Sequence, residues 1–127
     1  MLASLAAAFA QAAPARAQTM LVMPFENASG APGLEWVGET FPEILSQRMA
    51  SAQLYLVSRD DRNYAFERLG IPQNLRPSHA TLYRLGEEMD VDYVVIGSYR
   101  FDGRTFTASA RILEMTKLHL SPEVTES

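Results

Sequence analysis

Residues 92–103 read DYVVIGSYRFDG, and this stretch decides the class of fold. Its first ten residues are rich in aromatic and β-branched side chains, which is the composition of a β-strand. Asp102 and Gly103 then supply the residue types of a two-residue type I′ turn, which requires positive φ at both positions. Beyond the turn, residues 104–115 alternate apolar and polar side chains, so one face of this second strand is expected to be packed and the other polar. The stretch therefore predicts an antiparallel hairpin.

The residues before the hairpin alternate between strand-like and helix-like patterns. Short apolar runs of the kind found in buried strands occupy residues 20–25 and 54–59. Three helices are expected over residues 41–51, 61–69 and 79–89. Their predicted N-caps are Thr40, Asp60 and Ser78. Because Pro42 is best tolerated in a first helical turn, residues 34–38 are expected to form a separate turn before the first helix.

This order of elements predicts the fold class. A strand, a helix and a strand in succession favour a parallel crossover. The full pattern is β-α-β-α-α-β-β, which indicates a single α/β (α+β) domain with a mixed sheet and a C-terminal β-hairpin.

The two ends of the chain differ in composition from its centre. Residues 1–19 are dominated by alanine and leucine and contain no acidic residue, and a small-x-small site lies at Ala15, Arg16 and Ala17. This pattern is typical of a secretory signal peptide, with a disordered Ala-rich lead as the alternative. Residues 20–118 carry the domain pattern, and residues 119–127 are expected to begin a linker to a downstream region.

Composition and charge exclude several classes of function. The chain has 127 residues, a formal net charge of −4 and no cysteine. Nucleic-acid partners require clustered Lys and Arg, whereas the eleven basic residues here are scattered among fifteen acidic ones. The absence of cysteine removes thiolate catalysis, disulfides and a lipidated cysteine, so no direct lipid anchor is expected. Export without cysteine indicates the bacterial periplasm.

Residues 22–39, VMPFENASGAPGLEWVGE, run from an apolar segment through a glycine-containing loop towards a helix. Phosphate-binding loops use this arrangement, but they end in Gly-Lys-Ser/Thr or carry a G-x-G-x-x-G spacing, and this loop has neither. Acidic side chains that would repel a phosphate surround it at Glu26, Glu35, Glu39 and Glu43. The loop is therefore interpreted as a structural turn.

No other group of residues in the sequence indicates a catalytic site. His79 and His119 are forty residues apart, and a metal site needs at least three convergent ligands. The serines have no partner base and no Gly-x-Ser-x-Gly elbow. No catalytic residue, no cofactor and no metal site is therefore predicted, and the chain is expected not to be an enzyme.

The loop is instead the candidate partner-binding surface, because loops carry binding residues and this one places an aromatic side chain near acidic residues. Its candidate residues are Glu26, Asn27, Ser29, Gly30 and Trp36. Trp36 has a second interpretation, in which the indole fills the sheet edge as part of the core, and that interpretation is preferred.

Two motifs resemble a known family. VMPFENASG (residues 22–30) is similar to a PFxNxSG opening, and MDVDYVVIGSYRFDG (residues 89–103) is similar to an LGVDYVLxGS strand. Both belong to the envelope α/β domain shared by the TolB amino-terminal domain, the flagellar protein FlgO and the curli pore subunit CsgG. The chain most resembles the version at the front of bacterial tetratricopeptide-repeat proteins, over residues 20–118. The matching residues, as fold determinants, are Asn27, Ser29, Gly30, Asp92, Tyr93, Gly97 and Ser98.

This resemblance implies a non-enzymatic, exported module that binds proteins or assembles, with repeats following in a longer polypeptide. The protein partner is not identified by it, and homo-oligomer formation stays open. Two alternatives remain at this point: an α/β domain that uses the same loop to bind an anionic small molecule, and a ring-forming secretion or pore subunit.

Overall fold

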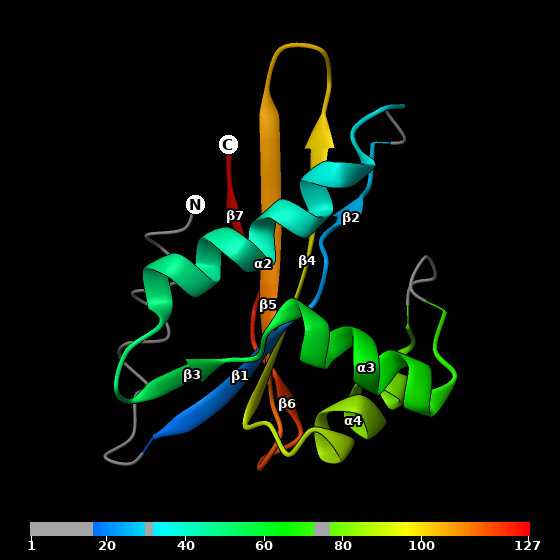
Figure 1. Ribbon diagram of the computed structural model, residues 1–127. Coiled ribbons are helices and arrows are strands. Elements are labelled where there is room, and N and C mark those ends of the chain that lie inside the picture. Colours follow the sequence, from blue (N-terminus) through cyan, green and yellow to red (C-terminus); the bar gives the residue numbers. More distant parts are fainter. Residues whose placement is uncertain (1–16, 30–31, 73–76) are drawn as a thin grey trace.

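The computed structural model describes residues 17–29, 32–72 and 77–127, and the structural statements below concern these residues. The helices among them are Glu35–Met49 (α2), Arg59–Leu69 (α3) and His79–Glu88 (α4). The strands are Gln18–Val22 (β1), Glu26–Asn27 (β2), Leu54–Leu56 (β3), Tyr93–Phe101 (β4), Phe106–Glu114 (β5), His119–Leu120 (β6) and Val124–Glu126 (β7). They form one mixed α/β unit, as the sequence predicts (Figure 1).

All the strands belong to one sheet with the order β3-β1-β4-β5-β6. β1 is parallel to both β3 and β4, and β4 is antiparallel to β5 along its whole length. The predicted parallel crossover from β1 through α2 to β3 and the predicted C-terminal hairpin are both confirmed. Figure 1 shows α2 lying across the sheet, with the β4–β5 hairpin extending beyond it.

The helices cover both faces of the sheet, because alternate side chains of β1 point to opposite sides. Met20 and Val22 belong to one buried cluster, which also contains Phe41 and Leu45 of α2. The residues between and after them face the other way, into a cluster with α3 and α4. Its buried members are Leu21, Met23, Ala65, Phe66, Leu82, Leu85, Val91, Val94 and Leu113. The domain is thus a three-layer structure with a core on each side of the sheet.

The first helix differs from its prediction. α2 is continuous from Glu35 to Met49 with Pro42 inside it, so the expected separate turn and the expected cap at Thr40 are wrong. A proline has no N–H for the carbonyl four residues earlier, which here is that of Gly38. That carbonyl accepts a hydrogen bond from the Phe25 N–H instead, at 3.0 Å. The helix therefore passes through the proline without leaving this carbonyl unpaired.

The second helix starts earlier than predicted, and the third agrees with its prediction. Ser58 caps α3, its hydroxyl accepting a hydrogen bond from the Asp61 N–H at 3.1 Å, so the expected cap at Asp60 is wrong. The helix ends at Gly70, which adopts a left-handed conformation with φ +67°, as expected of a glycine C-cap. Ser78 caps α4 by accepting from the Thr81 N–H, as predicted.

The hairpin turn is longer than a type I′ turn. Phe101 pairs with Phe106, which leaves a loop of residues 102–105, and only Gly103 of that loop has positive φ. The Asp102 carboxylate accepts from the Arg104 N–H at 2.8 Å and from the Thr105 N–H at 2.7 Å. The predicted two-residue turn is therefore wrong. Asp102 closes the loop through hydrogen bonds of its side chain and not through a positive φ.

The two ends of the described chain belong to the sheet. Of the expected signal segment, residues 1–16 lie outside the described residues, whereas Gln18 and Thr19 are part of β1. Residues 119–127, expected to begin a linker, instead contribute β6 and β7, which both pair with β5. The Ser121 hydroxyl also accepts from the Ile112 N–H at 2.8 Å. The sheet thus includes residues on both sides of the predicted domain limits.

Candidate functional site

The candidate loop begins at an irregularity between β1 and β2, which both pair with β4. Val22 is paired with Val95, and Glu26 is paired with Ser98. The chain therefore advances four residues from β1 to β2 while β4 advances three. This is the geometry of a β-bulge, in which one extra residue reverses the side-chain alternation. Because of it, Phe25 points to the same face as Val22, towards α2, and joins the cluster on that side.

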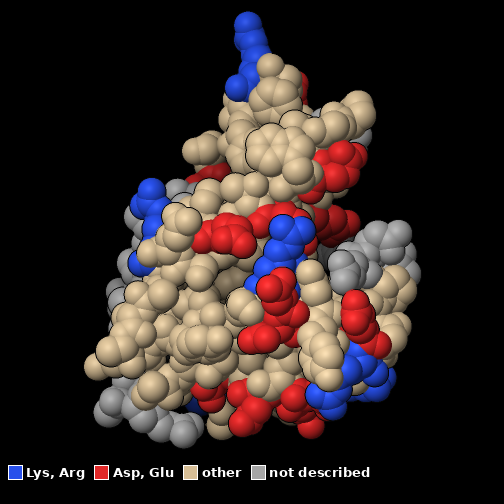
Figure 2. Space-filling view, in the orientation of Figure 1, with Lys and Arg blue, Asp and Glu red and all other residues tan. Residues whose placement is uncertain are grey.

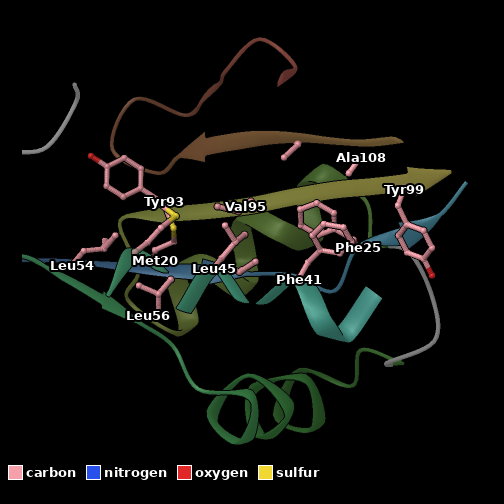
Figure 3. Packing of buried hydrophobic residues seen from close by; sticks show 13 residues of the cluster. Met20, Phe25, Phe41, Leu45, Leu54, Leu56, Tyr93, Val95, Tyr99 and Ala108 are labelled. Carbon is pink, nitrogen blue, oxygen red and sulfur yellow. The ribbon is translucent and has the colours of Figure 1, made fainter. Parts of the chain in front are cut away.

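The Phe25 ring starts an aromatic stack that connects the loop to α2 and the hairpin. It lies parallel to the Phe41 ring, with centroids 4.2 Å apart and planes 5° apart. Phe41 in turn stacks with Tyr99 and Phe106, at centroid distances of 6.0 and 6.3 Å. Figure 3 shows the Phe25 and Phe41 rings side by side beneath β4, with Tyr99 at the outer end of the stack. Such pairs stabilise beyond the area that they bury.

Two glycines make room for Phe25. A Cβ on Gly38 would lie 2.2 Å from the Phe25 carbonyl oxygen, and a Cβ on Gly97 would lie 2.4 Å from the Phe25 ring. Neither distance is possible between real atoms, so these positions require glycine whatever their backbone angles. Gly97 belongs to the VIGS part of the family-like motif, and its role in this structure is therefore to seat the phenylalanine of the other motif.

Two further motif residues also have structural roles. Asp92 accepts from the Thr19 N–H through its carboxylate, at 2.9 Å, and donates its own N–H to the Thr19 carbonyl. Asn27 accepts from both the N–H and the hydroxyl of Ser29, at 3.1 and 2.6 Å. These bonds fasten the start of β1 and the loop after β2, as expected of fold determinants.

The start of α2 is fastened to the sheet by Tyr99. The Tyr99 hydroxyl donates to the Leu34 carbonyl at 2.5 Å, and its side chain is almost completely buried. Burial raises the pKa of this phenol above its ordinary value, and the nearby Glu35 charge adds to the effect. The phenol therefore stays protonated at neutral pH, which is the form that can donate this hydrogen bond.

Trp36 is exposed, so its interpretation as a core residue is wrong. It occupies the first turn of α2 with 66% of its surface accessible. The buried residues of α2 are Gly38, Phe41, Leu45 and Met49. At 100° per residue, Trp36 lies about half a turn from that stripe and points into solvent. The structure thus leaves a large aromatic side chain on the surface of a firmly attached helix end.

The remaining loop residues lie at the edge of this surface. Glu26 is exposed and shares a face of the sheet with Ser98, whereas Asn27 shares a face with Tyr99. Ser29 is exposed beside Asn27, and Gly30 lies outside the described residues. The structure therefore places Glu26, Asn27 and Ser29 on one short segment, and Trp36 on the helix that follows it.

A hollow of about 740 Å³ borders this segment. Residues from both helical layers and from β4 and β5 line it, among them Phe66, Leu82, Ile96, Ser98, His79 and Arg111. Its lining also includes four carboxylate side chains, those of Glu26, Glu35, Glu39 and Glu123, against a single arginine. This balance of charge disfavours an anionic occupant.

A partly buried ion pair connects α2 with α3 beside the hollow. The Arg62 side chain is 3% exposed, and its Nη2 donates to both carboxylate oxygens of Glu39, at 2.9 and 2.8 Å. Arg59 approaches the same carboxylate at 3.6 Å. The Nε of Arg62 is buried with no hydrogen-bond partner among the described residues. The pair fixes the position of the helix that carries Trp36 but places no reactive group in the hollow.

The histidines and acids do not converge on one site. His79 begins α4, whereas His119 is in β6. Among the described residues, no group of three or more His, Cys, Asp or Glu side chains is placed to hold a metal ion. Within the same residues, no helix combines the length and the apolar character that crossing a bilayer requires.

Sequence reasoning missed several exposed aromatic side chains. Tyr55 and Tyr64 are more than half exposed, and Phe101 and Phe106 are 36% and 37% exposed. Phe106 lies on the packed face of its strand, as the alternating pattern predicts. The strand continues past the end of α2, however, so the helix covers only part of the ring. Only the relative lengths of the hairpin and α2 could have indicated this.

Comparison with solved structures identifies the fold. The LpoB C-terminal domain from Salmonella enterica superposes with a TM-score of 0.74 at 16% identity, over 97% of this chain and 91% of that one. Lipoprotein GNA1162 from Neisseria meningitidis gives 0.60 at 16% identity, over 86% and 78%. TolB from Acinetobacter baumannii gives 0.50 at 16% identity, over 91% of this chain and 24% of TolB. No protein-family model and no curated protein matches the sequence.

These comparisons confirm the expected envelope α/β fold, including its likeness to TolB. The finer resemblance to FlgO, to CsgG and to the version in tetratricopeptide-repeat proteins gains no support from them and stays a prediction. The expected absence of a lipid anchor gains none either, because one of the similar structures is a lipoprotein.

Proposed function

We propose that this chain is a non-enzymatic interaction module of the bacterial cell envelope, and that a protein partner docks on the start of α2 around Trp36. The observation that carries the proposal is the exposure of 66% of the Trp36 surface on an otherwise well-packed helix. Tryptophan is the side chain most enriched among residues that dominate binding energy. Glu26, Asn27 and Ser29 would then form the polar rim beside it.

The rigidity of this surface supports the proposal. Tyr99 holds the Leu34 carbonyl, and Phe41 locks the next turn of α2 into the aromatic stack. A partner that covers Trp36 therefore has little backbone to order on binding, and less of the binding energy is lost to entropy. A tryptophan that only faced solvent would gain nothing from this rigidity.

The cellular setting is proposed from the fold. The similar structures include a lipoprotein and TolB, and the N-terminal composition is that of a secretory signal, so a periplasmic location fits both. We further propose that the domain is the N-terminal part of a longer protein with tetratricopeptide repeats. The downstream coding sequence tests this part directly, because a repeat period of about 34 residues identifies such repeats.

The binding experiment compares two exposed aromatics. The full chain, its Trp36→Ala variant and its Tyr64→Ala variant are immobilised and exposed to an envelope extract of the organism that carries the gene, and bound proteins are quantified by mass spectrometry. Tyr64 is the matched control because it is 62% exposed on α3. We expect Trp36→Ala to lower capture of at least one protein about tenfold, the effect of a typical hot spot, and Tyr64→Ala to leave it unchanged.

Equal capture by all three forms would show that Trp36 does not lie in the partner-binding surface.

A thermal-shift panel of nucleotides and sugar phosphates tests the alternative function, in which the domain binds an anionic small molecule. A ligand present at 100 times its dissociation constant stabilises the folded state by about 2.7 kcal/mol. Because carboxylates dominate the hollow, we expect no shift from any of these compounds.

A further inference from the structure

The end of the β4–β5 hairpin is a second exposed surface, distinct from Trp36. The strands pair as far as Phe101 and Phe106, and Figure 1 shows that they extend beyond α2. We name the residues Arg100, Phe101, Arg104 and Phe106 the hairpin tip. From its charge and its aromatic content we propose that the hairpin tip docks on an acidic surface of a protein partner. This inference rests on the proposed function, since it gives the chemistry of one partner of the module.

The hairpin tip carries two arginines that lie outside the ion pairs of the described residues. Most basic side chains of the described residues lie in ion pairs, namely Arg59, Arg62, Arg68, Arg111 and Lys117. Arg100 and Arg104 have no ion pair with any described residue, and both are exposed. Figure 2 shows a basic side chain at the very end of the projection. On a chain with net charge −4, unpaired positive charge is thus presented at its most accessible point.

The aromatic side chains give the hairpin tip a contact area as well as a charge. Phe101 and Phe106 face each other across the strands, so their rings share one side of the hairpin. Phe106 also stacks on Tyr99 at 5.6 Å, which ties the pair to the buried aromatic stack. Both rings are nonetheless more than a third exposed. A partner could cover them without any rearrangement of the hairpin.

The loop between the two rings is held in one conformation. The Asp102 carboxylate accepts from two backbone amides of the loop, and the Asp102 N–H faces the Thr105 carbonyl at 3.3 Å. The carboxylate is therefore directed into the loop, and it forms no ion pair with Arg100 or Arg104. The positive charge of the two arginines is therefore not neutralised by Asp102, and the backbone that carries Arg104 is held by these hydrogen bonds.

These features fit a protein surface that surrounds an apolar recess with carboxylates. Arginine forms bidentate pairs with carboxylates, and aromatic and arginine side chains together are the enriched residues of protein interfaces. Two isolated arginines do not make the clustered basic patch that a nucleic-acid backbone requires. Because exposed charge pairs act mainly on association and are screened by salt, such binding should weaken as ionic strength rises.

The test uses defined probes with the full chain. Amide chemical shifts are followed by NMR during titration with a synthetic peptide of repeated Glu-Glu-Leu-Phe units, with the same peptide carrying Lys for Glu, and with vesicles of phosphatidylglycerol. The variant is Arg100→Glu with Arg104→Glu. The matched control is Arg48→Glu with Arg84→Glu, which makes the same change of net charge at exposed arginines that also lack ion pairs.

We expect the acidic peptide to shift the amides of the hairpin tip, the variant to weaken its binding about tenfold, and the control to change it less than twofold. Equal binding of the Lys peptide, shifts centred elsewhere, or tighter binding to the vesicles would each overturn the proposal. A self-association that the variant abolishes would also overturn it, because the occupant would then be a second copy of the chain. If Trp36→Ala abolishes capture from the extract while the acidic peptide fails to bind, only the inference about the hairpin tip is lost.

Discussion

Replacing Gly38 with alanine should destabilise the protein, although the same change in most helices does the opposite. Alanine is favoured over glycine inside a helix by about 0.8–1 kcal/mol. Here, however, the new Cβ would lie 2.2 Å from the carbonyl oxygen of Phe25, and that oxygen belongs to backbone rather than to a movable side chain. The contact can be relieved only by moving α2 away from the bulge between β1 and β2.

The cost of that movement follows from the contacts that it breaks. The hydrogen bond from the Phe25 N–H to the Gly38 carbonyl is 3.0 Å long, and leaving these buried groups unpaired costs about 1–3 kcal/mol. Overpacking at such a site costs about 1–3 kcal/mol, and loss of the stack between Phe25 and Phe41 about 0.5–1.5 kcal/mol. After the gain in helix propensity is subtracted, the expected net loss is about 4 kcal/mol, a large share of the stability of a small domain.

Urea unfolding followed by far-ultraviolet circular dichroism measures this loss. Gly86→Ala is the matched control, since Gly86 is also a buried helical glycine. Its Cβ would meet the Met115 Sδ and Cε at 2.8 Å, the end of a flexible side chain that can turn aside. We expect Gly86→Ala to stay within about 1 kcal/mol of the parent chain. A Gly38→Ala protein as stable as the parent, or more so, would refute the account of how α2 is joined to the sheet.

Three further perturbations test other contacts. Tyr99→Phe removes the hydrogen bond to the Leu34 carbonyl and should cost about 1 kcal/mol in urea unfolding, with faster amide hydrogen exchange in the first turn of α2. Glu39→Gln should lower the free energy of unfolding by about 2 kcal/mol, because it leaves the buried Arg62 guanidinium without its carboxylate partner. Arg62→Met should lower it less, since this change removes the buried charge as well. The reverse order of the two losses would contradict this account of the pair. Backbone hydrogen bonds lower the pKa of Asp102 below its ordinary value of 3.8, so its contribution to stability is fully present above that pH and is lost as the pH falls through the folded-state pKa. A carboxyl NMR titration that placed this pKa at or above the ordinary value would contradict the closed loop.

The elements that could be predicted from the sequence are those whose signals are local. Ser78 lies directly before a helix, and its side chain caps that helix in the structure. The apolar run of β4 and the position of the following turn are likewise set by residues within a few positions of one another. The parallel crossover follows from a general rule of chain chirality and needs no long-range information.

The errors concern choices that distant residues decide. Pro42 ends a helix unless another donor reaches the carbonyl that it leaves free, and the donor here, the Phe25 N–H, comes from a different element. Both Ser58 and Asp60 are good N-caps, and only the packing of α3 selects the serine. Each case offers two local solutions, and tertiary contacts distinguish them.

The candidate surface around the loop before α2 stays a prediction, and the structure corrects one of the expectations about it. The loop before α2 was chosen for its glutamates and its aromatic residue, but Trp36 was expected to be buried. Once the helix is continuous across Pro42, helical geometry alone places Trp36 opposite the buried stripe. The corrected helix therefore also corrects the expected exposure of Trp36. The hairpin tip had no comparable signal, because it depends on how far β4 and β5 extend past α2.

Both proposed surfaces depend on the same strand. Tyr99 of β4 holds the start of α2 in place, and two residues later β4 ends at Phe101 in the hairpin tip. Gly97 of the same strand seats Phe25 and so the aromatic stack to which Phe106 belongs. A TM-score of 0.74 at 16% identity shows that very different sequences adopt this fold. The proposed partner binding of this chain is therefore to be tested at the end of β4 and the start of α2, because the fold alone does not determine function.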